Sequence, residues 1–376
     1  MKRILYVCKF PLHINTSLKK KYMGQLQGFR NLGMDAYYLA YDEKYYYLIH
    51  NEEKIKLRRI YGSRTKLYLH SMAFIDMYLS AKKAMDILDF DYLYVRNDPI
   101  EYIGISMYRK AKRKEIYVIS ELPTYPNSRD NIKNGAYKLI LHIVDALGDK
   151  TAKYTDLYAV IGEECREYLG KPAINISNAV DVKQFALRTP KLGDRIVVLA
   201  VASMSAWHGF DRLIRGIAAY TGTDRICVKL VGNEGDGSCQ RWKELAKQLG
   251  VEDIVEFYDG RYGEELNEMM NQSDIAVSSI AWYRSKIQSG SPLKNREYMA
   301  RGIPFVYSVP DDTLHAGLDF VLRIEDNESP VNFEQICKFA ADCRKDQSMP
   351  VRMRQFAQAH MSWDAQLIKL FDISKP

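Results

Sequence analysis

Several features that would place the chain in a specialised class are missing from its 376 residues. No hydrophobic run reaches the length of a membrane span, because the longest candidates, 196–202 and 275–279, are only as long as strands. The six cysteines are scattered, without a CxxC pair or a histidine cluster, which argues against structural zinc and for reduced thiols. The basic first residues precede only a short apolar segment, so we expect a first strand there and not a signal peptide.

The glycine pattern of dinucleotide-binding proteins is also absent. Gly232, Gly235 and Gly237 do not follow the G-x-G-x-x-G spacing, and the first expected strand leads into KFP at 9–11. An NAD-type dehydrogenase is therefore disfavoured. DFD at 89–91 matches the Asp-x-Asp of metal-dependent transferases, but it precedes its strand, away from the edge where parallel sheets bind ligands. We expect an ordinary acidic loop there.

What is present indicates a soluble protein of two domains with unequal charge. A content of 47% hydrophobic and 27% charged residues is normal for globular proteins, and the length exceeds one ordinary core. Residues 1–185 hold 30 Lys and Arg against 21 Asp and Glu, a net charge of +9, whereas the remainder carries −2. The basic half could face an anionic membrane surface or nucleic acid, or it could be a solvated surface.

Apolar patterns in the first half alternate between strand and helix periods. Strands are expected at 3–7, 36–41, 92–95, 116–120 and 157–160, and helices from 16, at 71–88, 100–112 and 135–153. The tyrosine-rich stretch 37–61 fits an antiparallel excursion. This alternation predicts a parallel sheet with helices on both faces.

After a polar linker at 186–195, the alternation restarts. Strands are expected at 196–201, 227–231, 255–258, 275–279 and 305–307, with helices at 210–220, 240–249, 264–271 and 292–301. The sequence therefore predicts an α/β protein with two doubly wound, Rossmann-like domains facing across a cleft. We expect an amino-terminal domain at 1–185, a second at 186–350, and a helical segment at 351–376 returning toward the first, broken near residues 362–363.

The segment 289–308, SGSPLKNREYMARGIPFVYS, carries the strongest local signal. Ser291 and Pro292 fit an N-cap and first helical position, and Gly302 fits the helix end. Lys294 and Glu297 are three apart and therefore share a helix face. A helix start suits a phosphate, a nearby lysine adds charge, and a deeper carboxylate suits a ribose diol. The alternative is a solvated surface pair.

The residues of this half resemble retaining family-4 glycosyltransferases of the GT-B fold. VASMSAWHGFDRLIRGIAAY, VKLVGNEGDG, VEFYDGRYGEELNEMMNQSDIAVSSI and SPLKNREYMARGIPFV are similar to successive units of that family. In the first half, LKKKYMGQLQGFRNLGMDAYYL, SELPTYP and ISNAVDVKQF resemble capsule and exopolysaccharide members. The resemblance extends over nearly the whole chain and is most specific in the second half.

The resemblance also assigns roles at individual positions. Glu297 matches the second carboxylate of the family's Glu-x7-Glu motif, which holds the nucleotide ribose, and the first carboxylate is replaced by Ser289. The family's diphosphate-binding Arg and Lys fall at Ser203 and His208. We expect His208 in its protonated form, or Lys294 and Arg284, to supply the missing positive charge.

The other candidates lie in loops at the expected ligand edges. On the donor side these are Gly209, Gly232, Arg261, Tyr262, Gly290 and Ser291. On the acceptor side, Glu121 and Asp98 follow apolar strands and are candidate bases, beside the alternative that the departing phosphate takes the proton. Asn15–Ser17 and Lys20-Lys21 at the first helix could meet a phosphate or form an ordinary capped surface.

Taken together, the resemblance implies a glycosyltransferase that moves a sugar, with retention, from a nucleoside-diphosphate-sugar to a surface-polysaccharide or lipid-linked glycan acceptor. No cofactor or metal is expected, and no nucleic-acid partner. The expected place is the cytoplasm, with peripheral association at the inner membrane face through the basic half. The alternative is a catalytically degenerate GT-B scaffold of a glycan assembly complex, favoured by the losses at Ser203, His208 and Ser289.

Overall fold

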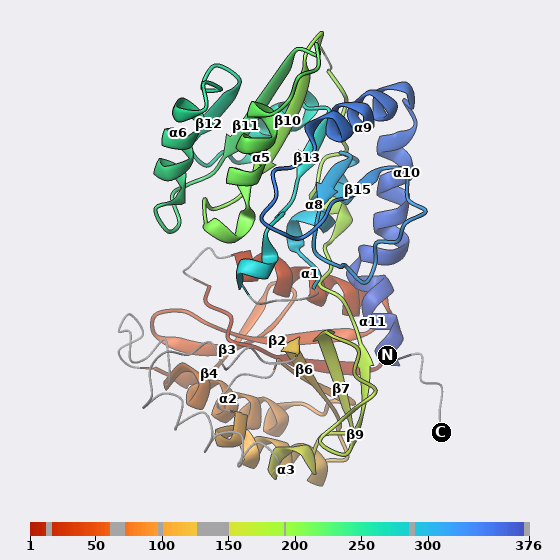
Figure 1. The fold of residues 1–376 in the computed structure, drawn as a ribbon. Helices are drawn as coiled ribbons and strands as arrows, with labels where there is room; N and C mark the ends of the chain where they lie inside the picture. Colours follow the sequence, from red (N-terminus) through yellow and green to blue (C-terminus); the bar gives the residue numbers. More distant parts are fainter. Residues whose placement is uncertain are drawn as a thin grey trace. The chain divides into compact units, whose positions relative to one another are not determined.

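The computed structural model describes residues 1–12, 17–60, 72–96, 101–125, 150–191, 193–285 and 290–371. The chain forms two compact units: the first combines Met1–Asp181 with the segment from Trp363 onward, and the second is Val182–Ser362. Each unit is a sheet with helices on its faces (Figure 1). The boundary at 181/182 lies four residues before the expected one, and the final segment joins the first unit only from Trp363.

The first unit is built on a nine-stranded sheet of order β4-β3-β2-β1-β5-β6-β7-β9-β8. Its parallel strands are β1 (Arg3–Val7), β2 (Asp35–Tyr41), β5 (Tyr92–Arg96), β6 (Tyr117–Tyr125), β7 (Leu157–Gly162) and β9 (Lys171–Asn175). The strands at both edges of the sheet pair in antiparallel fashion. They are β3 (Tyr45–His50) and β4 (Glu53–Arg59) at one edge and β8 (Glu167–Tyr168) at the other. The antiparallel excursion expected in 37–61 is confirmed.

Helices cover both faces of this sheet, as the alternation predicted. α2 (Ala73–Ile87) and α3 (Ile105–Arg113, after a 3-10 turn at Glu101–Gly104) contribute to one hydrophobic cluster. α1 (Ser17–Asn31) and α11 (Trp363–Phe371) contribute to the cluster on the opposite face. Most of the helix expected at 135–153 lies outside the described residues.

α1 and α11 pack unusually closely because α1 carries two glycines on one face. A Cβ added at Gly24 would lie 2.6 Å from the Trp363 indole, and one at Gly28 would lie 2.8 Å from Leu367 Cδ1. Trp363 is 1% exposed, so its indole is part of the first unit's core. The glycines at this four-residue spacing therefore create the space in which the end of the chain packs.

The second unit contains a six-stranded, fully parallel sheet of order β12-β11-β10-β13-β14-β15. Its strands are β10 (Ile196–Val201), β11 (Ile226–Val231), β12 (Val255–Tyr258), β13 (Ile275–Val277), β14 (Phe305–Tyr307) and β15 (Val321–Arg323). Its helices are α5 (Phe210–Ala218), α6 (Ser238–Gln248), α7 (Gly263–Asn271), α8 (Leu293–Arg301), α9 (Phe333–Lys345) and α10 (Met349–Phe356), the last followed by a π-helical turn at Ala357–Met361. The doubly wound prediction is confirmed, and one hydrophobic cluster joins the sheet to α5, α6 and α9.

One local prediction about α8 is wrong. Pro292, and not Ser291, is the N-cap residue, because its ψ of 129° is extended and helical geometry begins only at Leu293. No side chain caps the helix, while Asn295 N donates to Pro292 O over 3.0 Å. The helix ends at Gly302, whose φ of 74° is left-handed as the sequence predicted.

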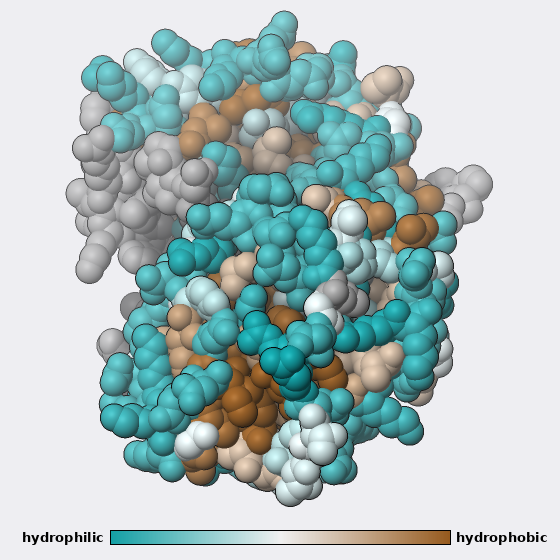
Figure 2. Space-filling view, turned by 90° about the horizontal axis from the view of Figure 1, so that it is seen from above, coloured by the Kyte–Doolittle hydropathy of each residue, from teal (hydrophilic) through white to brown (hydrophobic). Residues whose placement is uncertain are grey.

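Exposed large hydrophobic side chains occur at separate positions along the described part of the chain. Figure 2 shows, on the face seen from above, hydrophobic areas separated by hydrophilic residues. Among the described residues, none of the helices is both long and apolar enough to span a bilayer.

Candidate functional site

The candidate site lies at the carboxyl edge of the second sheet, where open parallel sheets bind ligands. Three segments contribute to it: the turn after β10, the residues after β13, and the first turn of α8. The turn after β10 is a 3-10 helix, Ala206–His208, which Gly209 separates from α5 with a left-handed φ of 73°. A Cβ at Gly209 would lie 2.7 Å from Ala281 Cβ, so this glycine lets the turn pack against the segment after β13.

His208 is held firmly within this packing. Its imidazole is 3% exposed and stacks on Phe210, with ring centroids 5.6 Å apart and planes 16° from parallel. Its carbonyl oxygen accepts a 3.0 Å hydrogen bond from Ile280 N, and Ser279 Oγ lies 2.8 Å from its Nδ1. The loop after β10 is thereby bound to the segment after β13 through both main chain and side chain.

Lys294 reaches His208 from the first turn of α8. Its Nζ lies 3.0 Å from His208 Nδ1 and 5.9 Å from the centroid of the Phe210 ring. Burial lowers the pKa of Lys294 to about 7, and burial together with the nearby ammonium lowers the pKa of His208 to about 2. The imidazole is therefore neutral at physiological pH and accepts a hydrogen bond from the ammonium. This environment disfavours the protonated His208, which was one of the two alternatives for the missing positive charge, and leaves Lys294 as the cation at this place.

Arg284 does not supply free positive charge either. It lies on the 3-10 turn Trp282–Ser285, and its guanidinium forms a bidentate pair with Asp211 at 2.8 and 2.9 Å and a second pair with Glu328. It also donates to Ala206 O over 2.9 Å. Hydrogen bonds from Arg284 to Asp211 and Glu328 raise its pKa, so it remains charged but compensated by two carboxylates. A role for Arg284 in ligand binding stays a prediction, and this pairing does not favour it.

Glu297 lies one turn after Lys294 on α8 and is partly exposed. Its Oε1 accepts a 2.8 Å hydrogen bond from Arg301 Nε, and Arg301 in turn donates to Asn267 of α7 over 2.6 Å. The Arg301 guanidinium also lies over the Phe185 ring, 5.2 Å from its centroid. The hydrogen bond from Arg301 therefore gives the Glu297 carboxyl group a defined orientation.

Behind α8 lies a buried polar network that the sequence analysis did not identify. Arg296 is fully buried and pairs with the buried Asp311. Asn295 Nδ2 donates to Asp311 Oδ2 over 3.0 Å and Asn295 Oδ1 accepts from Ser278 Oγ over 2.5 Å. Burial alone would raise the pKa of Asp311, but Arg296 and the hydrogen bonds lower it. This network attaches α8 to the residue after β13 and to the loop after β14. Its only signal in the sequence was the charge of Arg296, next to Glu297 in the motif.

The remaining donor-side candidates have mixed surroundings. Gly232 has a φ of 153°, and a Cβ there would lie 1.6 Å from Ala202 O, so only glycine fits. Gly290 packs so closely against Trp282 that an added Cβ would lie 2.6 Å from the indole, while Ser203 is exposed and Ser291 is buried.

Two candidates follow β12. Arg261 lies 3.8 Å from Glu265, and Tyr262, the N-cap residue of α7, is 75% exposed. Ser289 lies outside the described residues.

In the first unit, Glu121 is not placed to act as a base. It lies inside β6, fully buried, and accepts hydrogen bonds from four side chains: Lys21 (3.3 Å), Gln25 (2.6 Å), Tyr94 (2.8 Å) and Arg96 (2.6 Å). Burial alone would raise its pKa, but Lys21 and Arg96 lower the pKa to about 2. A buried carboxylate stabilised in this way holds protons too weakly for base catalysis. Asp98 lies outside the described residues.

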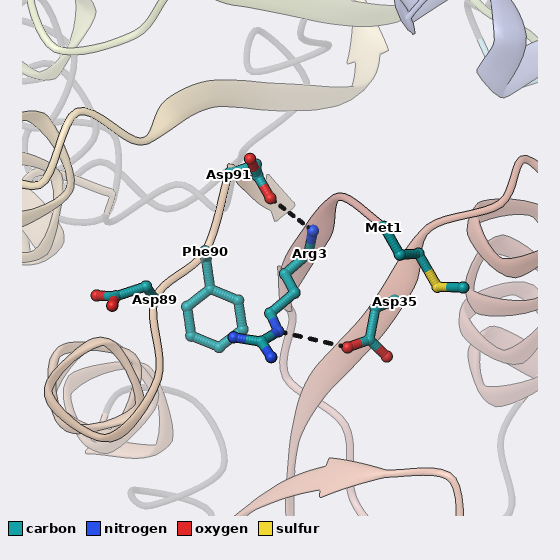
Figure 3. A pocket seen from close by; sticks show the side chains of 6 residues that line it. All are labelled: Met1, Arg3, Asp35, Asp89, Phe90 and Asp91. Atoms are coloured by element: carbon teal, nitrogen blue, oxygen red, sulfur yellow. Dashed lines mark hydrogen bonds and ion pairs between the residues drawn. The ribbon is translucent and has the colours of Figure 1, made fainter.

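The Asp-x-Asp segment lies at the opposite, amino edge of the first sheet. A cavity of about 370 Å³ is lined there by Met1, Arg3, Asp35, Asp89, Phe90 and Asp91 (Figure 3). Asp91 accepts a 2.7 Å hydrogen bond from Arg3 N, and Asp89 pairs with Lys114 at 2.9 Å. Because both carboxylates already pair with partners of this sheet edge, the structure agrees with an ordinary acidic loop.

Known proteins resemble this chain in part of its sequence and in its fold. Residues 183–314 match the family model described as glycosyl transferases group 1. The chain has the GT-B fold. The match covers β10 to α8 and therefore contains His208, Lys294 and Glu297, the residues of the candidate site.

Solved structures resemble the whole chain at low sequence identity. Anabaena HepE in complex with UDP is 12% identical with a TM-score of 0.62, covering 99% of this chain and 100% of that one. Sucrose-phosphate synthase from Thermosynechococcus elongatus is 13% identical with a TM-score of 0.66, covering 99% and 98%. WaaG, a glycosyltransferase of lipopolysaccharide biosynthesis, is 15% identical with a TM-score of 0.57, covering 98% and 99%. No curated protein matches the chain significantly.

Proposed function

We propose that the protein transfers a glycosyl group, with retention and without a metal ion, from a nucleoside-diphosphate-sugar to a surface-polysaccharide or lipid-linked glycan acceptor. The observation that carries this proposal is the arrangement of α8 within the group 1 match. Its first turn places the Lys294 ammonium beside the turn after β10, and Glu297 follows one turn later. A cation and a carboxylate at this spacing suit a diphosphate and the ribose attached to it.

The proposed donor lies along the carboxyl edge of the second sheet. Lys294 contacts the diphosphate, and Glu297, oriented by Arg301, accepts hydrogen bonds from the ribose hydroxyls. In this proposal the base meets Tyr262 and Arg261, which follow β12; the 75% exposure of Tyr262 supports this contact. Aromatic rings and guanidinium groups stack on bases of any kind, so this contact fits a nucleotide without selecting one.

The reaction needs few groups from the protein. The bond between the sugar's anomeric carbon and the diphosphate oxygen breaks, and its electron pair stays on that oxygen. The acceptor hydroxyl oxygen bonds to the anomeric carbon on the same face, and its proton passes to the departing phosphate. A cation at the phosphate stabilises the developing charge by a few kcal/mol in a dry site. This route requires no separate base. It therefore agrees with a Glu121 carboxylate that pairs with Lys21 and Arg96 and holds protons weakly.

Calorimetric titration with UDP, GDP and ADP tests the proposal. We expect at least one nucleotide to bind, and Glu297→Ala to weaken that binding by about 1–3 kcal/mol, the loss of one or two hydrogen bonds to a charged group. Glu252→Ala, at an exposed carboxylate before β12, is the matched control and should bind as the wild type does. Unchanged affinity in Glu297→Ala would contradict the assignment of the ribose contact.

A catalytically degenerate GT-B scaffold is the second candidate. It is favoured by the serine at 203, the neutral imidazole at 208 and the compensated charge of Arg284. A scaffold of this kind would bind none of the three nucleotides and would hydrolyse no sugar nucleotide. Donor hydrolysis, screened over common sugar nucleotides, separates the two candidates because it requires no acceptor.

We further propose a cytoplasmic protein whose basic first unit lies against the anionic inner membrane face, near a lipid-linked acceptor. Supporting this, the edge strand β4 exposes Lys54, Lys56 and Arg59 around the exposed Ile55. Sedimentation with vesicles containing anionic lipid should show binding that weakens as salt rises. Equal binding to neutral vesicles would contradict the electrostatic part of this proposal.

A further inference from the structure

We propose that His208 is a positioning residue that orients the Lys294 ammonium toward the donor diphosphate, so that α8 supplies the positive charge that the turn after β10 lacks. This inference rests on the proposed function and names the residue pair that recognises the diphosphate. The surroundings of the two side chains and the distance between them support it.

The position of the His208 imidazole is fixed by its own contacts, so it does not depend on where the Lys294 side chain lies. Ser279 Oγ contacts its Nδ1 at 2.8 Å, Phe210 stacks against its ring, and its own carbonyl is bonded to Ile280 N. Gly209 next to it has no space for a side chain. The position of Nδ1 is therefore defined, and with it the position of the Lys294 ammonium, which lies 3.0 Å away.

Lys294 differs from the arginines around it in its charge balance. Arg284 pairs with Asp211 and Glu328, and Arg301 pairs with Glu297. For Lys294, the polar partner within the described part of the chain is the neutral His208, and no carboxylate there lies within ion-pairing distance. An ammonium has three N–H donors and the imidazole accepts one, which leaves donors for an anion.

A partly buried ammonium without a carboxylate partner is unfavourable unless an anion binds to it. Burial alone lowers the pKa of Lys294 to about 7, and His208 is the titratable group that faces it from the turn after β10. From α5 it meets the uncharged Phe210, and Ser279 after β13 contacts the same imidazole nitrogen. A bound diphosphate would compensate the charge and raise this pKa again, so the site favours an anionic ligand.

The 3.0 Å separation makes the two positions interchangeable for a cation. A lysine at 208 starts from a main chain already bonded to Ile280, and we expect its ammonium to reach the place where Lys294 Nζ lies, because Nζ is only 3.0 Å from the present imidazole. If diphosphate recognition depends on a charge at this place, a lysine on either segment should provide it. If Lys294 serves only the packing of α8, a lysine at 208 should not compensate for its loss.

The test compares nucleotide affinity in four proteins: wild type, Lys294→Ala, His208→Ala, and the double variant Lys294→Ala/His208→Lys. The probe is whichever of UDP, GDP and ADP the wild type binds most tightly, titrated by calorimetry. We expect Lys294→Ala to lose at least tenfold in affinity and the double variant to recover most of that loss. His208→Ala should lose affinity while Lys294 is retained. Wild-type affinity in Lys294→Ala, or no recovery in a double variant whose circular dichroism is native, would overturn the inference.

The pH profile supplies a readout that a packing role would not change. Wild-type affinity should fall as pH rises above about 7, because the ligand-free ammonium loses its proton there. Lys294→Arg stays protonated and should bind with little pH dependence between pH 7 and 9. Identical profiles for both proteins would contradict the inference. A wild type that binds none of the nucleotides would instead contradict the proposed function itself.

Discussion

The two units each bury a charged side chain in their sheet region, and they treat it in opposite ways. In the first unit, Glu121 has two cations and two neutral donors around it, and its pKa is lowered to about 2. In the second unit, Lys294 has a neutral imidazole and an aromatic ring, and its pKa is lowered to about 7. One environment stabilises the ionised form, and the other disfavours it.

This difference separates a structural ion from a candidate binding group. A carboxylate with four donors is fully satisfied, so a ligand can add little to it. An ammonium that has lost water without gaining a carboxylate is stabilised when an anion arrives. Both Glu121 and Lys294 would be functional candidates if burial alone were considered. Their hydrogen-bond and ion-pair partners distinguish them.

The largest expected effect follows from removing the compensated carboxylate. Glu121→Leu removes the carboxylate that pairs with the buried Lys21 and the partly buried Arg96, and it should lower the free energy of unfolding by about 3–5 kcal/mol. Urea unfolding followed by circular dichroism measures this. Glu164→Gln, whose exposed pair with Arg166 contributes at most about 1 kcal/mol, is the control. Equal effects in the two variants would remove the contrast between the units.

The same change of charge to apolar should not destabilise the second unit. Lys294→Met keeps the length of the side chain and removes an ammonium that has no carboxylate partner among the described residues. We expect a melting temperature equal to or above that of the wild type. A large drop would show that the ammonium contributes to folding, as Glu121 does.

The pH dependence of stability should also differ between the units. Glu121 has a lowered pKa, so its contribution is present above the unfolded value of 4.5 and is lost as pH falls toward about 2. Lys294 also has a lowered pKa, but for a base this means that the unfolded chain binds the proton more tightly. Stability should therefore rise between pH 7 and about 10.5.

Urea unfolding over a pH series tests both windows. Glu121→Gln should lack the acid-side loss, and Lys294→Met should lose part of the alkaline-side gain. Part of that gain should remain, because burial also lowers the pKa of Lys21 in the first unit to about 8. An alkaline gain that is unchanged in Lys294→Met would contradict the pKa assigned to this lysine.

The smallest effect is expected for Arg284→Gln. Asp211 and Glu328 already compensate the guanidinium, so we expect nucleotide affinity to change less than about threefold. Titration with the same nucleotide used for Lys294→Ala makes the comparison direct. A loss as large as in Lys294→Ala would place Arg284 among the ligand contacts.

Much of the fold could be predicted from the sequence, because it depends on local periodicity. The alternation of strand and helix patterns predicted both sheets, and the glycine at 302 predicted the end of α8 correctly. The N-cap was misassigned because serine usually fills that position, whereas here the extended ψ of Pro292 begins the helix.

The charge balance of the site could not be predicted, because it depends on contacts between distant segments. Lys21 meets Glu121 across 100 residues, Lys294 meets His208 across 86, and Arg284 meets Asp211 across 73. Periodicity shows which face a side chain occupies but not which partner it finds. Glu121 was therefore taken for an accessible base, and Arg284 for an available cation.

The packing of Trp363 against Gly24 and Gly28 has a consequence for synthesis. The helix that covers α1 belongs to the first unit, but it leaves the ribosome only after residues 182–362 have been made. The second unit can therefore fold on the nascent chain while part of the first unit's core is still unmade. Domains usually mature in the order in which they are translated. Here the first unit can complete its core only after the second unit has been translated. A premature stop before residue 363 would leave the apolar face of α1 exposed and prone to aggregation.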